Sequence, residues 1–268
     1  MRIATHNVNS IRSRVDRVVA WLGRVQPDVV ALQETKCRDD QLPRERFEEL
    51  GYEVAHHGLN QWNGVAVLSR VGLDDVEIGF PGQPTWGEPE PVAEARAIGA
   101  TCGGVRVWSV YVPNGRQIGD PHMEYKLQWL HALAAHGRDR LAADPDLQMA
   151  FCGDWNVAPF DEDVWSPEFY ADKSHTSPEE RAGFGAVVDA GYADVVRPFA
   201  PGPGVYTYWD YQRLRFARRE GMRIDFILAS PALAQRVSAA AIDREERKGK
   251  GASDHAPVVV QLDGGTED

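Results

Sequence analysis

The apolar positions in the first part of the chain alternate between short runs and a helical spacing. Runs at 3–8, 28–32 and 64–68 predict strands, and the segment 51–57 predicts a further extended stretch. Between the first two runs, apolar residues recur with the 3.6-residue period of a helix at Val15, Val18, Val19, Leu22 and Val25. Pro27 predicts the end of that helix. This order of strand, helix and strand is typical of an α/β fold.

The same order returns in the middle of the chain. Residues 95–101 and 105–112 predict a hairpin around Gly103 and Gly104. A helix of roughly five turns is predicted by the apolar residues Met123, Leu127, Leu130, Ala134 and Leu141. The run 147–152 then predicts a strand that leads into Asp154 and Asn156. We therefore expect two similar layers packed face to face, with acidic residues meeting at one edge.

The remaining segments predict one long loop, one capped helix and two more strands. Residues 79–94 are rich in Gly, Pro and Glu, which is typical of a surface loop. Ser177 is a suitable N-cap, Pro178 suits the first helical position, and Glu180 completes a capping box. Residues 223–228 and 258–262 predict strands. Since no stretch has the composition of a linker, we expect a single domain over residues 1–268.

Composition narrows the class of protein. The formal net charge of −11 argues against coating nucleic acid by bulk charge but leaves room for a local basic groove. The three cysteines, Cys37, Cys102 and Cys152, are too far apart for a zinc site or a disulfide framework, so we expect buried thiols in a reducing compartment. A strand-like pattern from Arg2 and the lack of a membrane-length apolar segment predict a cytoplasmic protein that binds no membrane.

Polar side chains follow the predicted strands at several places. They are Asn7, Glu34, Tyr111, Asp154 with Asn156, Asp225, and Asp254 with His255. Open α/β sheets commonly place their chemistry where strands end. Gly153-Asp154-Trp155-Asn156 alone is equally typical of a turn. The recurrence of the pattern favours a functional site.

Asp225 carries specific information because it lies between Ile224 and Phe226. A carboxylate there is costly to bury without a partner, and His255 is a candidate. Such a pair would fix the tautomer of the imidazole and raise its basicity. From its spacing alone, His255 is equally consistent with a hydrogen-bonded core histidine.

Three carboxylates, those of Glu34, Asp154 and Asp254, would repel one another at one site unless a cation or proton offset their charge. Oxygen ligands without cysteine favour Mg²⁺ or Mn²⁺ over zinc. Because Mg²⁺ commonly joins one or two carboxylates to a phosphate, the residue types predict metal-assisted attack on a phosphate ester.

Five motifs in order resemble the endonuclease/exonuclease/phosphatase superfamily, and in particular the exonuclease III family of apurinic/apyrimidinic endonucleases. They are Thr-His-Asn7-Val-Asn9-Ser-Ile-Arg12, Leu-Gln-Glu34-Thr-Lys, Phe-Cys-Gly-Asp154-Trp-Asn156, Arg-Ile-Asp225-Phe and Ser-Asp254-His255-Ala-Pro. Trp-Asp210-Tyr-Gln adds to the resemblance, which extends from Arg2 to Leu262. It implies a four-layered αββα sandwich of two mixed β-sheets flanked by helices.

The resemblance also implies residue roles. Glu34 would be the main ligand of Mg²⁺, or of Mn²⁺ as a substitute, with Asn7, Asp154, Asn156 and Asp254 around the metal. Asp154 would activate the attacking water or protonate the leaving oxygen, and Asn156 would orient it. His255, held by Asp225, would stabilise the attacked phosphate, which Tyr111 would also contact.

Two positions depart from relatives of this family. Asn9 stands where some eukaryotic relatives carry Asp, which removes one metal ligand. Tyr208 stands where a Trp lines the abasic-sugar pocket of a bacterial relative, with Trp209 beside it. An aromatic wall is therefore kept, with a different shape.

An enzyme for DNA needs cations for phosphates and apolar side chains for an extruded nucleotide. The segment 213–223 offers both, and further DNA contacts are expected near strand ends. The predicted contacts are Asn63, Arg96, Asn114, Arg116, Lys126, Tyr208, Trp209, Arg213, Arg215, Phe216, Arg218, Arg219, Met222, Arg223, Lys248 and Lys250. A solvated basic face is the alternative for that segment.

These observations predict a monomeric DNA-repair nuclease. It would cut 5′ to abasic sites in double-stranded DNA and remove nucleotides or blocking groups from 3′ ends. The alternatives are another phosphoesterase of the same superfamily, such as an inositol-phosphate phosphatase, a sphingomyelinase or an RNA deadenylase, and a DNA-binding relative that has lost catalysis.

Overall fold

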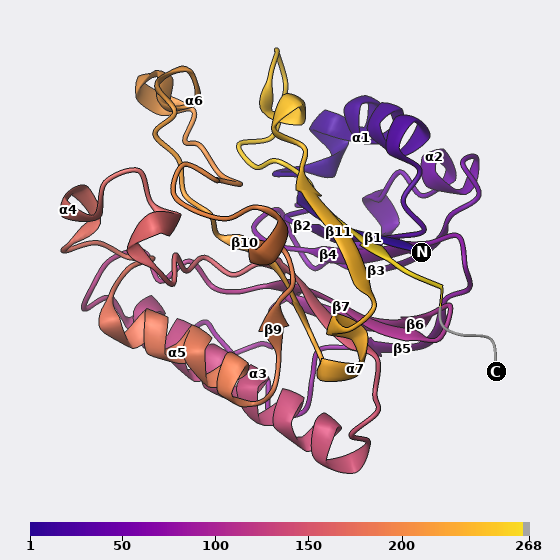
Figure 1. Cartoon of the computed structure of the whole chain (residues 1–268), viewed down its shortest axis with the longest axis horizontal. Coiled ribbons are helices and arrows are strands. Elements are labelled where there is room, and N and C mark those ends of the chain that lie inside the picture. Colours follow the sequence, from indigo (N-terminus) through magenta and orange to yellow (C-terminus); the bar gives the residue numbers. More distant parts are fainter. Residues whose placement is uncertain (265–268) are drawn as a thin grey trace.

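Two six-stranded mixed sheets pack face to face in the computed structural model, which describes residues 1–264 (Figure 1). The first sheet has the order β11-β12-β1-β2-β4-β3. Its strands are β1 (Arg2–Asn7), β2 (Val29–Gln33), β3 (Glu53–His57), β4 (Val65–Ser69), β11 (Val237–Ile242) and β12 (Val258–Leu262). The second sheet has the order β5-β6-β7-β8-β10-β9. Its strands are β5 (Asp74–Ile78), β6 (Ala97–Cys102), β7 (Val105–Tyr111), β8 (Met149–Asp154), β9 (Ala193–Asp194) and β10 (Asp225–Ala229).

Helices cover the outer faces of both sheets. Their bounds are α1 (Ile11–Val25), α2 (Glu45–Glu48), α3 (Pro121–Ala143), α4 (Pro167–Tyr170), α5 (Pro178–Asp189), α6 (Arg215–Arg218) and α7 (Pro231–Ala234). Short 3₁₀ turns lie at Asp39–Gln41, Asp161–Asp163, Arg197–Phe199, Gln212–Leu214 and Arg244–Arg247. Helices α1 and α2 lie on the first sheet, and α3 and α5 on the second (Figure 1). The predicted four-layered αββα sandwich is confirmed.

Period-2 alternation along the strands builds three cores from one chain. Ile3 and Val107 point between the sheets, where they join residues from both. Ala4 points outward to Trp21 of α1, and Trp108 points outward to Trp129 of α3. Each sheet is therefore buried on both faces, which explains why its strands are mostly continuous apolar runs.

The repeated order of strand, helix and strand in the sequence corresponds to the same strand arrangement in both sheets. In the first sheet, β1 and β2 are parallel and joined by α1, and β12 lies antiparallel to β1. In the second sheet, β7 and β8 are parallel, α3 joins them, and β6 lies antiparallel to β7. Each parallel pair is followed by an antiparallel neighbour, β4 or β10. The ends of β2 and β8 thus become equivalent positions in the two layers.

The sequence pattern missed the two-residue edge strand β9 and two longer edge strands, β5 and β11. Acids occupy three of the five positions of β5, and three alanines dominate β11, so neither has an apolar run. The predicted capping box at Ser177 and Glu180 is present at the start of α5. The cysteines are buried and free. None of the helices in the described residues has both the length and the apolar character needed to span a bilayer.

Candidate active site

Strand register places three polar side chains in one row across the second sheet. Asp154 at the end of β8 pairs with Tyr111 of β7 on one side and with Asp225 of β10 on the other. Residues opposite each other in a sheet point to the same face. Asp154 and Asp225 are almost fully buried, and Tyr111 is 8% exposed.

The first sheet contributes Asn7 and Glu34 to the same point. Asn7 ends β1, and Glu34 follows β2 with a φ of +51°, a conformation that non-glycine residues rarely adopt. The turn is held because the Glu34 carbonyl accepts from the Ser10 amide at 2.7 Å. Backbone held in such a conformation is commonly found at functional sites.

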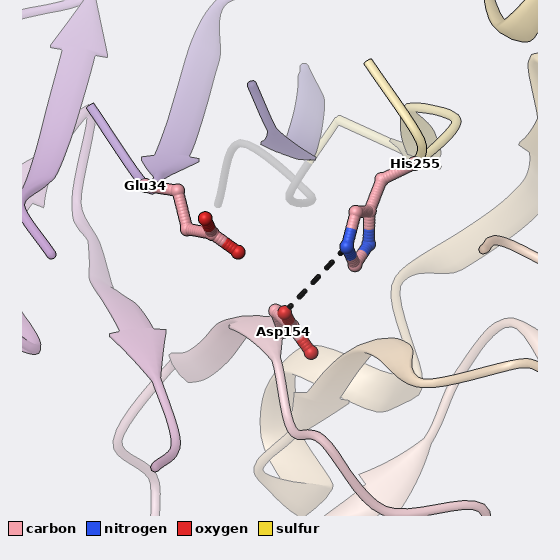
Figure 2. Close-up of side chains that lie close together, drawn as sticks. All are labelled: Glu34, Asp154 and His255. Carbon is pink, nitrogen blue, oxygen red and sulfur yellow. Dashed lines mark ion pairs between the residues drawn. The ribbon is translucent and has the colours of Figure 1, made fainter. Parts of the chain in front are cut away.

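One side-chain amide joins the two layers. Asn7 Nδ2 donates to Glu34 Oε1 at 2.8 Å and to Asp154 Oδ2 at 2.9 Å. Glu34, Asp154 and His255 each offer a ligand atom, and these atoms lie within 4.8 Å of one another (Figure 2). Figure 2 shows the three side chains converging from different segments.

The buried carboxylate of Asp225 orients the imidazole of His255. Its Nδ1 lies 2.8 Å from Asp225 Oδ2, and its Nε2 lies 3.8 Å from Asp154 Oδ2. Burial alone would lower the pKa of His255, but the charges of Asp225 and Asp154 outweigh it and raise that pKa to about 10. The two carboxylates therefore favour the protonated imidazole, whose Nε2 faces Asp154.

The acids of the site differ in protonation. Burial, opposed by His255 and reinforced by Asp225 and Glu34, raises the pKa of Asp154 to about 7. Burial also favours the neutral form of Glu34, but the charges of Lys36 and His255 outweigh it and lower the pKa of Glu34. Lys36 Nζ lies 2.7 Å from Glu34 Oε2 and also donates to Asn9 Oδ1 at 2.7 Å. A carboxyl that titrates near neutrality beside an ionised one suits proton transfer.

The donor set fits a divalent cation with oxygen ligands. Two carboxylates, Glu34 and Asp154, approach each other closely enough to share the Asn7 amide, and a cation between them would offset their repulsion. Asp254 is placed differently from Glu34, since its Oδ1 accepts from Asn9 Nδ2 at 2.9 Å. Asn156 Oδ1 already accepts from Asn114 Nδ2 at 3.0 Å.

Asn156 is held by residues that sequence reasoning did not single out. His175 Nε2 lies 3.1 Å from Asn156 Oδ1, and Asn156 Nδ2 donates to the Val112 carbonyl at 3.0 Å. Asn156 and His175 both have positive φ, at +50° and +82°. His175 follows a loop without apolar periodicity, so its type and spacing carried no signal.

A hollow of about 480 Å³ opens beside the site. Its lining includes the rings of Phe169, Tyr170 and Tyr208 together with Met222, Arg116 and Arg215. The Tyr208 ring also lies against His255, with 4.9 Å between ring centroids. Asp172, Asp210 and Glu220 also line the hollow, so it combines aromatic walls with charged groups of both signs. Its aromatic walls suit an uncharged ring or sugar.

Several residues predicted to contact DNA are buried, and this corrects the prediction of direct contact. Lys126 is fully buried against Glu180, and Trp209 is 1% exposed. Arg223 pairs with Asp163 at 2.7 Å and with Asp194 at 2.5 Å. The other buried members are Met222, Asn63, which donates to Glu94, and Arg96, which also pairs with Glu94. Spacing along the sequence could not show that carboxylates neutralise the cations Lys126, Arg96 and Arg223.

Other predicted contacts lie on the surface. Asn114, Arg116, Arg213, Arg218, Arg219 and Lys250 are exposed, and Arg215 and Phe216 are half-buried. Leu214, at the tip of this segment, is 74% exposed. A second basic surface was not predicted: Trp62 is 69% exposed beside Arg12, Lys36 and Arg38. In the sequence, the sign of this surface was a Trp directly before Asn63 in the loop that precedes β4.

The comparisons with known proteins agree with this geometry. The sequence profile of the endonuclease/exonuclease/phosphatase family matches residues 4–255. The chain belongs to this family. Exodeoxyribonuclease III of Haemophilus influenzae is 31% identical over 275 residues, which cover 98% of this chain and 100% of the relative. The predicted resemblance to the exonuclease III family is confirmed.

Two solved structures share the whole fold. The 3′ phosphatase NExo from Neisseria, bound to a product DNA hairpin, is 37% identical with a TM-score of 0.91, and the match covers 98% of this chain and 99% of that one. An AP endonuclease from Archaeoglobus fulgidus is 36% identical with a TM-score of 0.91, at the same coverage of both chains. Relatives of this fold are thus described with two different DNA activities.

Proposed function

We propose that this protein is a Mg²⁺-dependent DNA-repair nuclease that cuts 5′ to abasic sites and removes nucleotides or blocking groups from 3′ ends. The observation that carries the proposal is the convergence of Glu34, Asp154 and the Asp225–His255 pair beside a hollow lined by aromatic rings and arginines, which it meets where Tyr208 lies against His255. Similarity to exodeoxyribonuclease III and to the two DNA-acting neighbours supports DNA as the substrate.

The three proposed reactions break the same type of bond. Incision 5′ to an abasic site, removal of a 3′ nucleotide and removal of a 3′ phosphate each break P–O3′ and leave a 3′-hydroxyl. A single arrangement of an attacking water, a phosphate and a leaving O3′ therefore serves all three. What differs among these substrates is the group beyond the phosphorus, which the hollow lined by Phe169, Tyr170 and Tyr208 would receive.

The side chains divide the chemistry among them. Asp154, with a pKa near neutrality, would take a proton from the attacking water, and Asn156 would orient that water. The His255 cation would donate from Nε2 to a phosphate oxygen as negative charge develops there, while Asp225 keeps the ring in place. Burial raises the pKa of Tyr111 well above its ordinary range, so its phenol would stay neutral and donate to the same phosphate.

The remaining group needed is a cation at Glu34. Mg²⁺ bound there, with Asn7 and Asp154 close by, would offset the charge of the phosphate. Mn²⁺ accepts the same oxygen ligands and would substitute for it. Asp254 would support the metal site from the Asn9 side.

The DNA would lie along the basic edge on both sides of the hollow. We propose Asn114, Arg116, Arg213, Arg215 and Arg218 as phosphate contacts on one side. Arg12 and Arg38 with Trp62 form the second side. The buried residues Lys126, Trp209, Arg96 and Asn63 would act by supporting this edge instead of touching DNA. We further propose a cytoplasmic monomer, consistent with three free buried cysteines.

One assay tests the proposal. Three labelled duplexes are incubated with Mg²⁺ or with EDTA: one with an abasic-site analogue, one with a 3′ phosphate at a nick, and one intact and blunt. We expect Mg²⁺-dependent formation of a 3′-hydroxyl on the damaged duplexes, and its loss in Asp154→Ala with DNA binding retained. Failure on all three would favour another phosphoesterase or a non-catalytic DNA-binding relative. Near-full activity of Asp154→Ala would overturn the proposed mechanism.

A further inference from the structure

Two buried charged residues next to Asn156, Lys126 and Glu180, have no role in the proposed reaction. Lys126 of α3 and Glu180 of α5 are both fully buried and form an ion pair. The two helices approach closely at Gly183, where an added Cβ would lie 2.9 Å from a Leu130 methyl. Buried ion pairs are a weak source of stability, because desolvation offsets most of their attraction.

The lysine donates to two carbonyls of the catalytic edge. Lys126 Nζ donates to the Asn156 carbonyl at 2.6 Å and to the Asn114 carbonyl at 3.4 Å. Asn156 has a positive φ, so its peptide carbonyl lies outside the regular strand ladder and needs a donor. A buried ammonium supplies two such bonds at once, which no apolar side chain can do.

The glutamate holds the other side of Asn156. Glu180 Oε1 accepts from the His175 amide at 2.9 Å, and His175 in turn places Nε2 3.1 Å from Asn156 Oδ1. Glu180 Oε2 accepts from the Ser177 amide at 3.1 Å as part of the capping box of α5. The carboxylate therefore links the start of a helix to the strained turn at His175.

We propose that Lys126 and Glu180 are positioning residues that hold Asn156, Asn114 and His175 in their working arrangement. Lys126 fixes the backbone of Asn156 from beneath, and Glu180 fixes the His175 turn that contacts its side chain. This inference rests on the proposed nuclease function for its kinetic consequence. Its structural part, the restraint on Asn156 and His175, is measurable without any reaction.

The kinetic test compares single and double variants. Lys126→Met removes the donor, Glu180→Gln leaves the lysine without its counter-charge, and the double variant Lys126→Met/Glu180→Met removes both charges. We expect a loss of kcat of roughly 10- to 100-fold in all three, as a shift of about 1 Å in a catalytic group produces, with little change in KM. The double variant should unfold at a higher temperature than Glu180→Gln while its kcat stays low. Lys126→Arg, which keeps the charge and the donors, should recover part of kcat.

Arg106→Gln is the matched control, because Arg106 is 4% exposed and pairs with Glu77 on the far part of the second sheet. It should lower the unfolding temperature and leave kcat within about twofold, as expected away from the catalytic groups. A double variant with wild-type kcat would overturn the proposal, because the pair would then be structural only. The proposal would also be overturned if kcat in every variant fell only in proportion to the fraction of protein that is unfolded.

A second measurement separates this proposal from the proposed function. Two-dimensional NMR follows the His175 amide and the Asn156 side-chain amide in the wild type and in Lys126→Met/Glu180→Met. Broadened or shifted signals and faster amide exchange at these residues, and unchanged ones at Arg106, support positioning. Unchanged signals at Asn156 and His175 overturn it. If the wild type cleaves no DNA, the proposed function fails, and these signals still decide the role of the pair.

Discussion

The imidazole of His255 and the carboxylate of Asp225 meet at 2.8 Å, Nδ1 to Oδ2, inside a buried site. Asp225→Asn keeps the shape and removes the charge that raises the pKa of His255. We expect the imidazole to lose its proton at a lower pH and kcat to fall roughly 100-fold at pH 7.5, with larger losses at higher pH. An NMR titration of the His255 ring and pH profiles of kcat check both parts. An unchanged ring titration in Asp225→Asn would contradict this account.

Lys36 competes with the proposed cation for Glu34. Its Nζ lies 2.7 Å from Glu34 Oε2, so Lys36→Met frees that oxygen and removes a positive charge beside the metal. We expect the Mg²⁺ concentration for half-maximal activity to fall by about 3- to 10-fold, which corresponds to roughly 1 kcal/mol. Magnesium titrations of activity, with Mn²⁺ binding by calorimetry as a second readout, measure this. Weaker metal binding in Lys36→Met would mean that the lysine orients Glu34 more than it opposes the metal.

Arg213 and Arg218 are exposed cations on the segment beside the hollow. The double variant Arg213→Ala/Arg218→Ala should bind DNA more weakly at low salt, and the slope of log K against log salt should become shallower by about two. Fluorescence anisotropy between 50 and 200 mM salt, roughly the range over which such contacts are screened, gives the slope. The matched control is Arg138→Ala, an exposed arginine on α3. Equal slopes for wild type and the double variant would place the DNA elsewhere.

His136 makes stability depend on pH. It is buried between aromatic rings, and burial, with Arg140 next, lowers its pKa to about 4. Between pH 4 and the ordinary value of 6.5 the unfolded chain binds the extra proton, so the free energy of unfolding rises with pH there and is lost on acidification. The expected slope is about 1.4 kcal/mol per pH unit from this one group.

His136→Phe keeps an aromatic ring and removes that titration. Urea unfolding at pH 4.5, 5.5 and 6.5, roughly spanning this window, should show a gap between wild type and variant that changes in favour of the wild type as pH rises. A gap that stays constant with pH would show that folding does not lower the pKa of His136.

The sequence predicted the residues whose partners lie in motifs and missed those whose partners lie elsewhere. Asp225 lies between apolar neighbours, so the sequence indicated that it requires a counter-charge, and His255 provides it. The capping box at Ser177 could be predicted because its two partners are only three residues apart. Lys126 looked like a surface cation because Glu180, 54 positions away, cannot be paired with it from spacing.

The same reasoning explains what was missed in the fold. Strand β11 is an edge strand with exposed alanines, so burial imposes no apolar alternation on it. His175 is placed by the backbone of a turn and by Glu180, and neither leaves a trace in residue type. Long-range packing decides these positions, and local sequence does not encode it.

The pairing of β1 with β12 joins two strands that lie far apart along the sequence, and next to it the Met1 amino group donates to the Leu262 carbonyl at 3.1 Å. His255 lies just before β12, and its carboxylate partner Asp225 is only 30 residues earlier. During synthesis on the ribosome, β1 is made long before its antiparallel neighbour β12. The site therefore assembles only after the segment with His255 and β12 has left the exit tunnel, and a chain that stops before His255 would lack the partner of Asp225.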